Sequence, residues 1–83
     1  MPVALRLMHT MQTPEVMRAW ESITARNGFG PGWFRQNVSE YSASHPVEAL
    51  AETFALLTRA DYVRGTLPKA IEDYVFRDLL GEH

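Results

Sequence analysis

Two glutamates, Glu48 and Glu52, lie four residues apart in the otherwise apolar segment PVEALAETFALL, residues 46–57. On a helix, residues at this spacing are neighbours, and two like charges repel each other by roughly 0.2–0.5 kcal/mol. A metal ion, a cation or a set of hydrogen-bond donors offsets such a repulsion. The pair is therefore the first candidate in this chain for metal-binding chemistry, in which carboxylate oxygens ligate the ion.

Each glutamate also has an interpretation that needs no metal. If His45 is the N-cap of a helix, Glu48 lies three positions further on, and its carboxylate can accept a hydrogen bond from the His45 backbone N–H, as in a capping box. Its charge there also complements the helix dipole. Glu52 in turn can face solvent or pair with a basic residue such as Arg59 or Lys69. The spacing alone does not decide between these interpretations.

The histidines do not form the motif of a zinc peptidase. Zincin peptidases bind zinc through two histidines on one helical turn, HExxH, whose glutamate is the general base, and through a third ligand from a later helix. The chain contains only His9, His45 and His83, and none has a second histidine four residues away. His45 and Glu48 could share an ion, but two ligands bind weakly and unselectively. We therefore expect no cofactor in the isolated chain.

The segment YSASHPVEALAETFALL, residues 41–57, nevertheless resembles the third-ligand helix of the zincin-like metallopeptidases. The likeness is to the anthrax lethal factor-like peptidases and to the phage-encoded zincin-like peptidases. The resemblance implies that Glu48 is a zinc ligand and that Glu52 orients a ligand histidine. It implies that Tyr41 donates a hydrogen bond to the oxyanion of the tetrahedral intermediate. The plainer alternative for Tyr41 is a loop anchor with its hydroxyl in water.

The expected function follows from the presence of a segment that resembles the third-ligand helix and from the absence of the HExxH motif in the sequence. Without the HExxH helix, the chain is a zincin-derived half-domain that is catalytically incomplete alone. It contributes a zinc ligand and an oxyanion-binding tyrosine only if another polypeptide completes the site, and zinc is the cofactor of that complete site. The alternative is a non-enzymatic helical module, of the phage-encoded kind, that binds a host or virion protein.

The composition of the chain argues against several other classes of function. The chain has 83 residues, 46% of them hydrophobic, which predicts one small domain with a core of its own. The net charge is −2, and the eight Lys and Arg residues are scattered, so we expect no nucleic-acid binding. The absence of cysteine fits a reducing compartment, and no segment is apolar for long enough to span a membrane. We expect a cytoplasmic or virion-associated protein.

Hydrophobic periodicity predicts an all-α domain over residues 1–83, with three to four helices and one long loop. Thr13 and Pro14 are typical of a helix start and predict a helix over 14–26. Further helices are predicted over 46–59 and 67–80. The segment 3–11 fits a fourth helix, although its alternating apolar residues also fit a strand.

The predicted loop, residues 28–44, is rich in glycine and aromatic residues. Its Phe29, Trp33 and Phe34 either pin the loop to the core or form a rim that faces a partner. The missing HExxH helix should also leave an apolar face uncovered around Leu50 and Phe54, and such faces favour association. We therefore expect self-association or a protein partner through these five residues.

Overall fold

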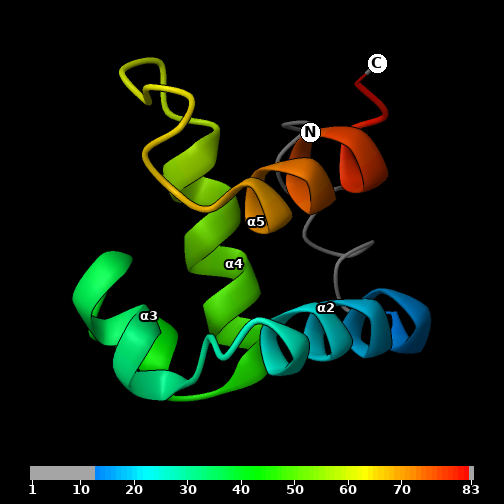
Figure 1. Cartoon of the computed structure of the whole chain (residues 1–83), viewed down its shortest axis with the longest axis vertical. Coiled ribbons are helices and arrows are strands. Elements are labelled where there is room, and N and C mark those ends of the chain that lie inside the picture. Colours follow the sequence, from blue (N-terminus) through cyan, green and yellow to red (C-terminus); the bar gives the residue numbers. More distant parts are fainter. Residues whose placement is uncertain (1–12, 83) are drawn as a thin grey trace, which may run out of the picture.

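A computed structural model describes residues 13–82 of the chain, which form helices joined by short connections. The elements in chain order are α2 (Pro14–Arg26), α3 (Pro31–Asn37), the 3₁₀ turn η1 (Tyr41–Ala43), α4 (Pro46–Leu57), α5 (Lys69–Asp73) and the π-helical η2 (Tyr74–Leu79). No strand occurs in this part of the chain, which confirms the small all-α domain. In Figure 1, α4 runs through the centre, α2 lies across its lower end, and α3 and α5–η2 flank it on opposite sides.

The first described helix has the bounds that its sequence signals predict. Thr13 is the N-cap of α2, and its side-chain oxygen accepts a hydrogen bond from the Val16 N–H at 3.3 Å. Pro14 occupies the first helical position, where the missing N–H costs nothing. After the helix, Gly28 adopts a φ of 73°, a left-handed conformation that glycine takes without strain. The chain can therefore turn sharply towards α3.

The prediction of one long loop over residues 28–44 is wrong, because this segment contains α3 and η1. Pro31 opens α3 at its first helical position, the same start signal that opens α2 and α4. The buried Ser42 then ties η1 to the end of α3, because its hydroxyl is 3.0 Å from the Phe34 carbonyl and 2.6 Å from the Ser39 carbonyl. This fold-back places the end of the segment at the start of α4.

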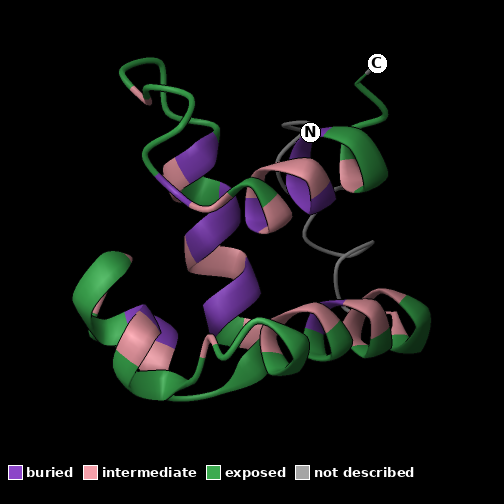
Figure 2. Cartoon of the chain, viewed as in Figure 1, coloured by how far each residue is buried: buried purple, intermediate pink, exposed green. Residues whose placement is uncertain are grey.

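The last helix begins at Lys69 rather than at residue 67. Leu67 is buried ahead of it as part of the core. The helix changes from α to π at Tyr74, and Tyr74, Val75 and Phe76 are all buried. Three consecutive buried residues require contacts around more than one narrow stripe of the helix. The start of this element is thus enclosed on several sides, whereas Arg77, Asp78 and Leu80 at its end are exposed, and Figure 2 shows the same distribution.

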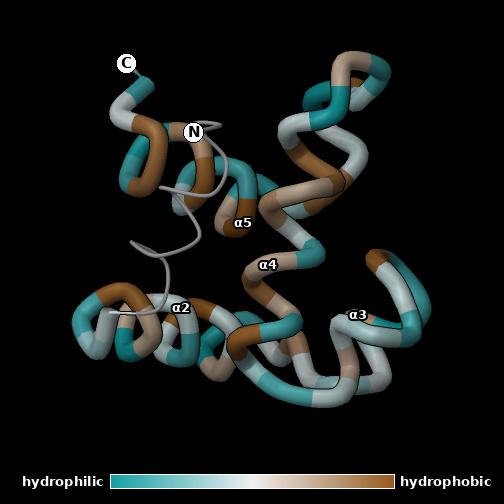
Figure 3. The backbone as a smooth tube through the Cα atoms, turned by 180° about the vertical axis from the view of Figure 1, so that it is seen from behind, coloured by the Kyte–Doolittle hydropathy of each residue, from teal (hydrophilic) through white to brown (hydrophobic). Residues whose placement is uncertain are grey.

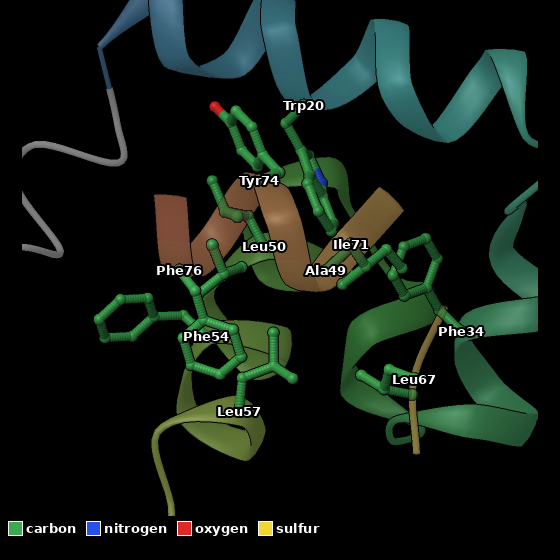
Figure 4. Packing of buried hydrophobic residues seen from close by; sticks show 11 residues of the cluster. Trp20, Phe34, Ala49, Leu50, Phe54, Leu57, Leu67, Ile71, Tyr74 and Phe76 are labelled. Atoms are coloured by element: carbon green, nitrogen blue, oxygen red, sulfur yellow. The ribbon is translucent and has the colours of Figure 1, made fainter. Parts of the chain in front are cut away.

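One hydrophobic core joins all the helices. The Trp20 ring of α2 lies 5.6 Å from the Phe34 ring of α3 and 5.9 Å from the Tyr74 ring, measured between centroids (Figure 4). The Tyr74 hydroxyl also donates a hydrogen bond to the Val16 carbonyl at 2.9 Å. Ile71 is completely buried beside them. Trp20 is therefore the most deeply buried of the α2 side chains that attach this helix to the rest of the fold.

The expectation of an uncovered apolar face on α4 is wrong. Leu50 and Phe54 are only 1% and 6% exposed, and both belong to the core. Phe34 is buried as well, so only Phe29 and Trp33 of the predicted contact residues keep partial exposure. The argument for self-association that rested on Leu50 and Phe54 therefore no longer applies.

The remaining expectations concern the ends of the elements. α4 ends at Leu57, two residues before the predicted bound, where Thr58 is the C-cap and donates its hydroxyl to the Phe54 carbonyl at 2.8 Å. The helix expected over residues 3–11 lies outside the described residues. Within residues 13–82, no helix is both long and apolar enough to cross a membrane. Figures 1 and 3 show from both sides that the connection between α4 and α5 projects away from the other helices.

Candidate functional site

The start of α4 carries most of the candidate residues, and His45 defines it. His45 is the N-cap, and its Nδ1 accepts a hydrogen bond from the Val47 N–H at 3.2 Å. This hydrogen bond gives His45 a structural role at the helix start, with Nδ1 engaged in the cap.

Glu48 lies at the third position of α4 and faces solvent. Its carboxylate makes no hydrogen bond and no ion pair with any residue in the range 13–82. In particular, it does not accept the reciprocal hydrogen bond from the His45 N–H that a capping box requires. The helix dipole is therefore the only structural role that remains for this carboxylate, and its oxygens are accessible to a ligand or a metal ion.

Glu52 lies one turn further on the same side of α4 and is half-buried. The two basic residues considered as its partners are engaged elsewhere. Arg59 binds Asp61 through two hydrogen bonds of 3.0 and 2.9 Å, and Lys69 binds its own helix neighbour Asp73 at 2.6 Å. The pairing of Glu52 with Arg59 or Lys69 is therefore wrong for the described structure.

Tyr41 occupies the first position of η1, and its side chain is 73% exposed. Its hydroxyl has no hydrogen-bond partner among residues 13–82. The anchor of this segment is the neighbouring Ser42, which is 2% exposed and bonded to α3. Tyr41 is thus free to contact a molecule that approaches the start of α4, and it contributes nothing visible to the core.

The described residues do not assemble a metal site by themselves. Over residues 13–82, no three side chains of the types His, Cys, Asp or Glu lie close enough together to hold an ion. His9 and His83, the other two histidines, lie outside the described residues. The exposed carboxylate of Glu48 is therefore not part of a set of three potential ligands within residues 13–82.

A second feature is an apolar hollow of about 230 Å³ where α2, α3, η1 and the start of α4 meet. The buried rings of Trp20 and Phe34 and the half-buried ring of Phe29 line it, and the apolar wall continues over Pro46 and Ala49. Sequence reasoning selected Phe29 and Phe34 but missed Trp20, because nothing in the sequence brings α2 next to residues 29–49.

A hydrogen-bonded network in the α4–α5 connection was also missed. The Tyr62 hydroxyl donates to Glu72 Oε2 at 2.5 Å, and the same oxygen accepts the Gly65 N–H at 2.7 Å. The Tyr62 oxygen in turn accepts the Leu67 N–H at 2.9 Å. Burial and the hydrogen bond to Glu72 raise the pKa of Tyr62 to about 12. This network stabilises the α4–α5 connection against the start of α5. No rule of sequence spacing predicts a hydrogen bond between Tyr62 in the connection and Glu72 in α5, ten positions later.

Comparison of the chain with protein-family models, with curated proteins and with solved structures finds no match. The resemblance to zincin-like peptidases therefore rests on the residues of the segment 41–57 alone.

Proposed function

We propose that the chain is a zincin-derived half-domain whose α4 supplies one zinc ligand, Glu48, to a site completed by another polypeptide. The observation that carries the proposal is the state of the Glu48 carboxylate, which is exposed and without a partner among residues 13–82. A glutamate kept only for a capping box would bond back to His45, and it does not. Its oxygens are thus accessible to an ion held by a second chain.

The neighbouring residues support the same proposal. Tyr41 is exposed just before α4, where its phenol can donate a hydrogen bond to a substrate oxygen. Glu52 is half-buried one turn from Glu48, a suitable position for a carboxylate that orients a ligand histidine. Zinc in such a site would act as a Lewis acid and activate a water molecule. Because residues 13–82 hold only one of the ligands, we assign no catalytic step to this chain alone.

The test supplies the missing ligands in trans. A synthetic amphipathic helix peptide that contains HEAAH is titrated with zinc chloride in the presence and absence of the chain. We expect the chain to raise the zinc affinity of the peptide at least about tenfold, since even an outer partner of a zinc site is typically worth 10–100-fold in metal affinity. The gain should disappear in Glu48→Gln.

Glu15 provides the matched control. It is an exposed glutamate in the first turn of α2, a helix that also begins with proline. Glu15→Gln should keep the full effect of the chain on zinc binding. Equal zinc affinity of the peptide with and without the chain, or an equal loss in the Glu15 and Glu48 variants, would contradict the proposal.

A second candidate function is a non-enzymatic protein-interaction module that binds a host or virion protein. The apolar hollow between α2 and α3 favours it, because the half-buried Phe29 and the exposed Pro46 in its lining offer a partner side chain accessible apolar surface. This function needs neither zinc nor Glu48. Its test is the peptide titration described next.

A further inference from the structure

The size of the apolar hollow limits what it can hold. Its volume of about 230 Å³ lies below the roughly 300–1,000 Å³ of typical small-molecule sites. This size suits one long side chain of a partner protein better than a drug-sized ligand or a cofactor.

The polar groups at the hollow indicate which side chain that is. Among residues 13–82, Glu21 of α2 is the only acidic residue that lines it, and no arginine or lysine does. The Glu21 carboxylate is exposed and has no ion pair or hydrogen bond within residues 13–82. His45 also lines the hollow, where its Nδ1 accepts a hydrogen bond from the Val47 N–H. The hollow thus combines one uncompensated negative charge with an apolar, aromatic wall.

Aromatic rings reinforce this charge preference. The faces of Trp and Phe rings carry negative electrostatic potential and attract cations. An arginine guanidinium stacks on such rings, and its planar fork matches a carboxylate with two parallel hydrogen bonds. Trp20 and Phe34 are buried, so the half-buried Phe29 supplies the accessible ring and Glu21 supplies the carboxylate. An acidic or a purely apolar side chain would leave Glu21 either repelled or desolvated without a partner.

We propose that the hollow between α2, α3 and the start of α4 binds a basic side chain, above all arginine, of a partner protein. The methylene stem of that side chain lies along Phe29 and Pro46, and its guanidinium pairs with Glu21. This inference rests on the interaction-module function and is independent of the zinc proposal.

The experiment uses short peptides as probes. Four peptides of the form acetyl-Gly-Ser-Xaa-Ser-Gly-amide carry arginine, citrulline, norleucine or glutamate at Xaa, citrulline being the neutral counterpart of arginine. Binding to the full chain is followed by NMR through the Trp20 indole N–H and the Ala49 amide, both at the hollow. We expect the arginine peptide to bind about fivefold tighter than the citrulline peptide, the upper range for an exposed ion pair.

Substitution of two exposed glutamates of α2 distinguishes binding at the hollow from a general effect of surface charge. Glu21→Gln should lower the affinity for the arginine peptide to that of the citrulline peptide, whereas Glu15→Gln, away from the hollow, should leave it unchanged. Both substitutions lie on the surface, so the variants should fold.

The other outcomes overturn the proposal in different ways. If norleucine binds as tightly as arginine and Glu21→Gln has no effect, the hollow is an apolar site and only the interaction-module function survives. If no peptide shifts the Trp20 signal at about 10 mM, where even weak millimolar binding would show, both the inference and that function fail. A Trp20 shift that depends on protein concentration without peptide would make a second copy of the chain the occupant.

Discussion

Two glutamates lie in the first turns of neighbouring helices, Glu48 in α4 and Glu72 in α5, and the fold treats them in opposite ways. Glu72 accepts hydrogen bonds from the Tyr62 hydroxyl at 2.5 Å and from the Gly65 N–H at 2.7 Å. Glu48 accepts none from the described residues. The fold explains why a carboxylate is present at position 72, whereas it leaves the one at position 48 available for binding.

Two tyrosines, Tyr62 and Tyr41, show the same contrast. Tyr62 is half-buried, and its hydroxyl both donates to Glu72 and accepts from the Leu67 N–H. Tyr41 is 73% exposed, and its hydroxyl has no partner in residues 13–82. A polar group that stabilises the fold can thus be recognised by its hydrogen bonds. An exposed polar group without such hydrogen bonds is a candidate for binding another molecule.

The largest effect should come from removing the carboxylate that the fold uses. Glu72→Ala leaves the Tyr62 hydroxyl and the Gly65 N–H without their acceptor. Hydrogen bonds to a charged group typically contribute about 1.5–3 kcal/mol, and we expect a loss of that size in the free energy of unfolding. Urea denaturation followed by circular dichroism measures it.

The matched variant is Glu48→Ala, which removes the same group from the first turn of α4. Only the dipole interaction is lost, typically about 0.3–1 kcal/mol for an exposed residue, and alanine recovers part of this through its higher helix propensity. The stability should therefore stay within about 0.5 kcal/mol of the parent. Equal losses for Glu48 and Glu72 would show that Glu48 has a structural role and would weaken the zinc proposal.

The stability of the fold at alkaline pH provides a second test of the contrast between Tyr62 and Tyr41. The folded state holds the phenol proton of Tyr62 with a pKa of about 12, against an ordinary value of 10. A raised pKa in the folded state stabilises the fold fully below pH 10, and this stabilisation is lost as the pH rises from 10 to about 12. Burial also raises the pKa of Tyr74, which adds to the loss in the same direction.

Tyr62→Phe should reduce the stability at pH 7 by about 1 kcal/mol, the usual net value of one hydrogen bond, and should flatten the decline above pH 10. Tyr41→Phe should change neither, because its hydroxyl is in water. Thermal unfolding at pH 7, 9, 10 and 11 distinguishes the two variants. A parent and a Tyr62→Phe variant with parallel pH profiles would mean that another group causes the alkaline loss.

The fold was predictable from sequence where local signals coincide with hydrophobic periodicity. Thr13 and Pro14 mark the start of α2, and the apolar spacing of residues 47–57 marks the buried face of α4. The prediction of a loop over residues 28–44 was wrong because the glycines of this segment favour a loop, while Pro31 at the first position of a short helix is a weaker signal for a helix. Short helices depend on tertiary packing, which the sequence does not display.

The candidate site was predictable only in part, for a related reason. Glu48 was selected by its spacing from Glu52 and Tyr41 by the resemblance of the segment 41–57, and both are exposed. Leu50 and Phe54 were misplaced because the face they occupy was assumed to lack a cover, whereas the core formed with Ile71 encloses them. Burial arises from contacts between segments far apart in the chain, so spacing within one helix cannot reveal it.

The only gain in stability is expected at Thr53. This residue of α4 is completely buried, and its hydroxyl has no hydrogen-bond partner among the described residues. A buried hydroxyl without a partner loses its hydration without compensation, which costs about 1–3 kcal/mol. Valine has nearly the same shape and a similar helix propensity. Thr53→Val should therefore raise the free energy of unfolding by about 1 kcal/mol, seen as an increase of roughly 4–8 °C in the melting temperature.

Thr58, on the same helix, is the matched case of a hydroxyl with a partner. Its hydroxyl donates a hydrogen bond to the Phe54 carbonyl at 2.8 Å at the end of α4, and the residue is exposed. Thr58→Val removes this hydrogen bond and should lower the stability by about 0.5–1 kcal/mol. Opposite signs at Thr53 and Thr58 would extend the contrast between Glu48 and Glu72 into the core. A loss of stability in Thr53→Val would mean that its hydroxyl has a partner in solution, and the rule that unpartnered groups are structurally dispensable would then not hold for this helix.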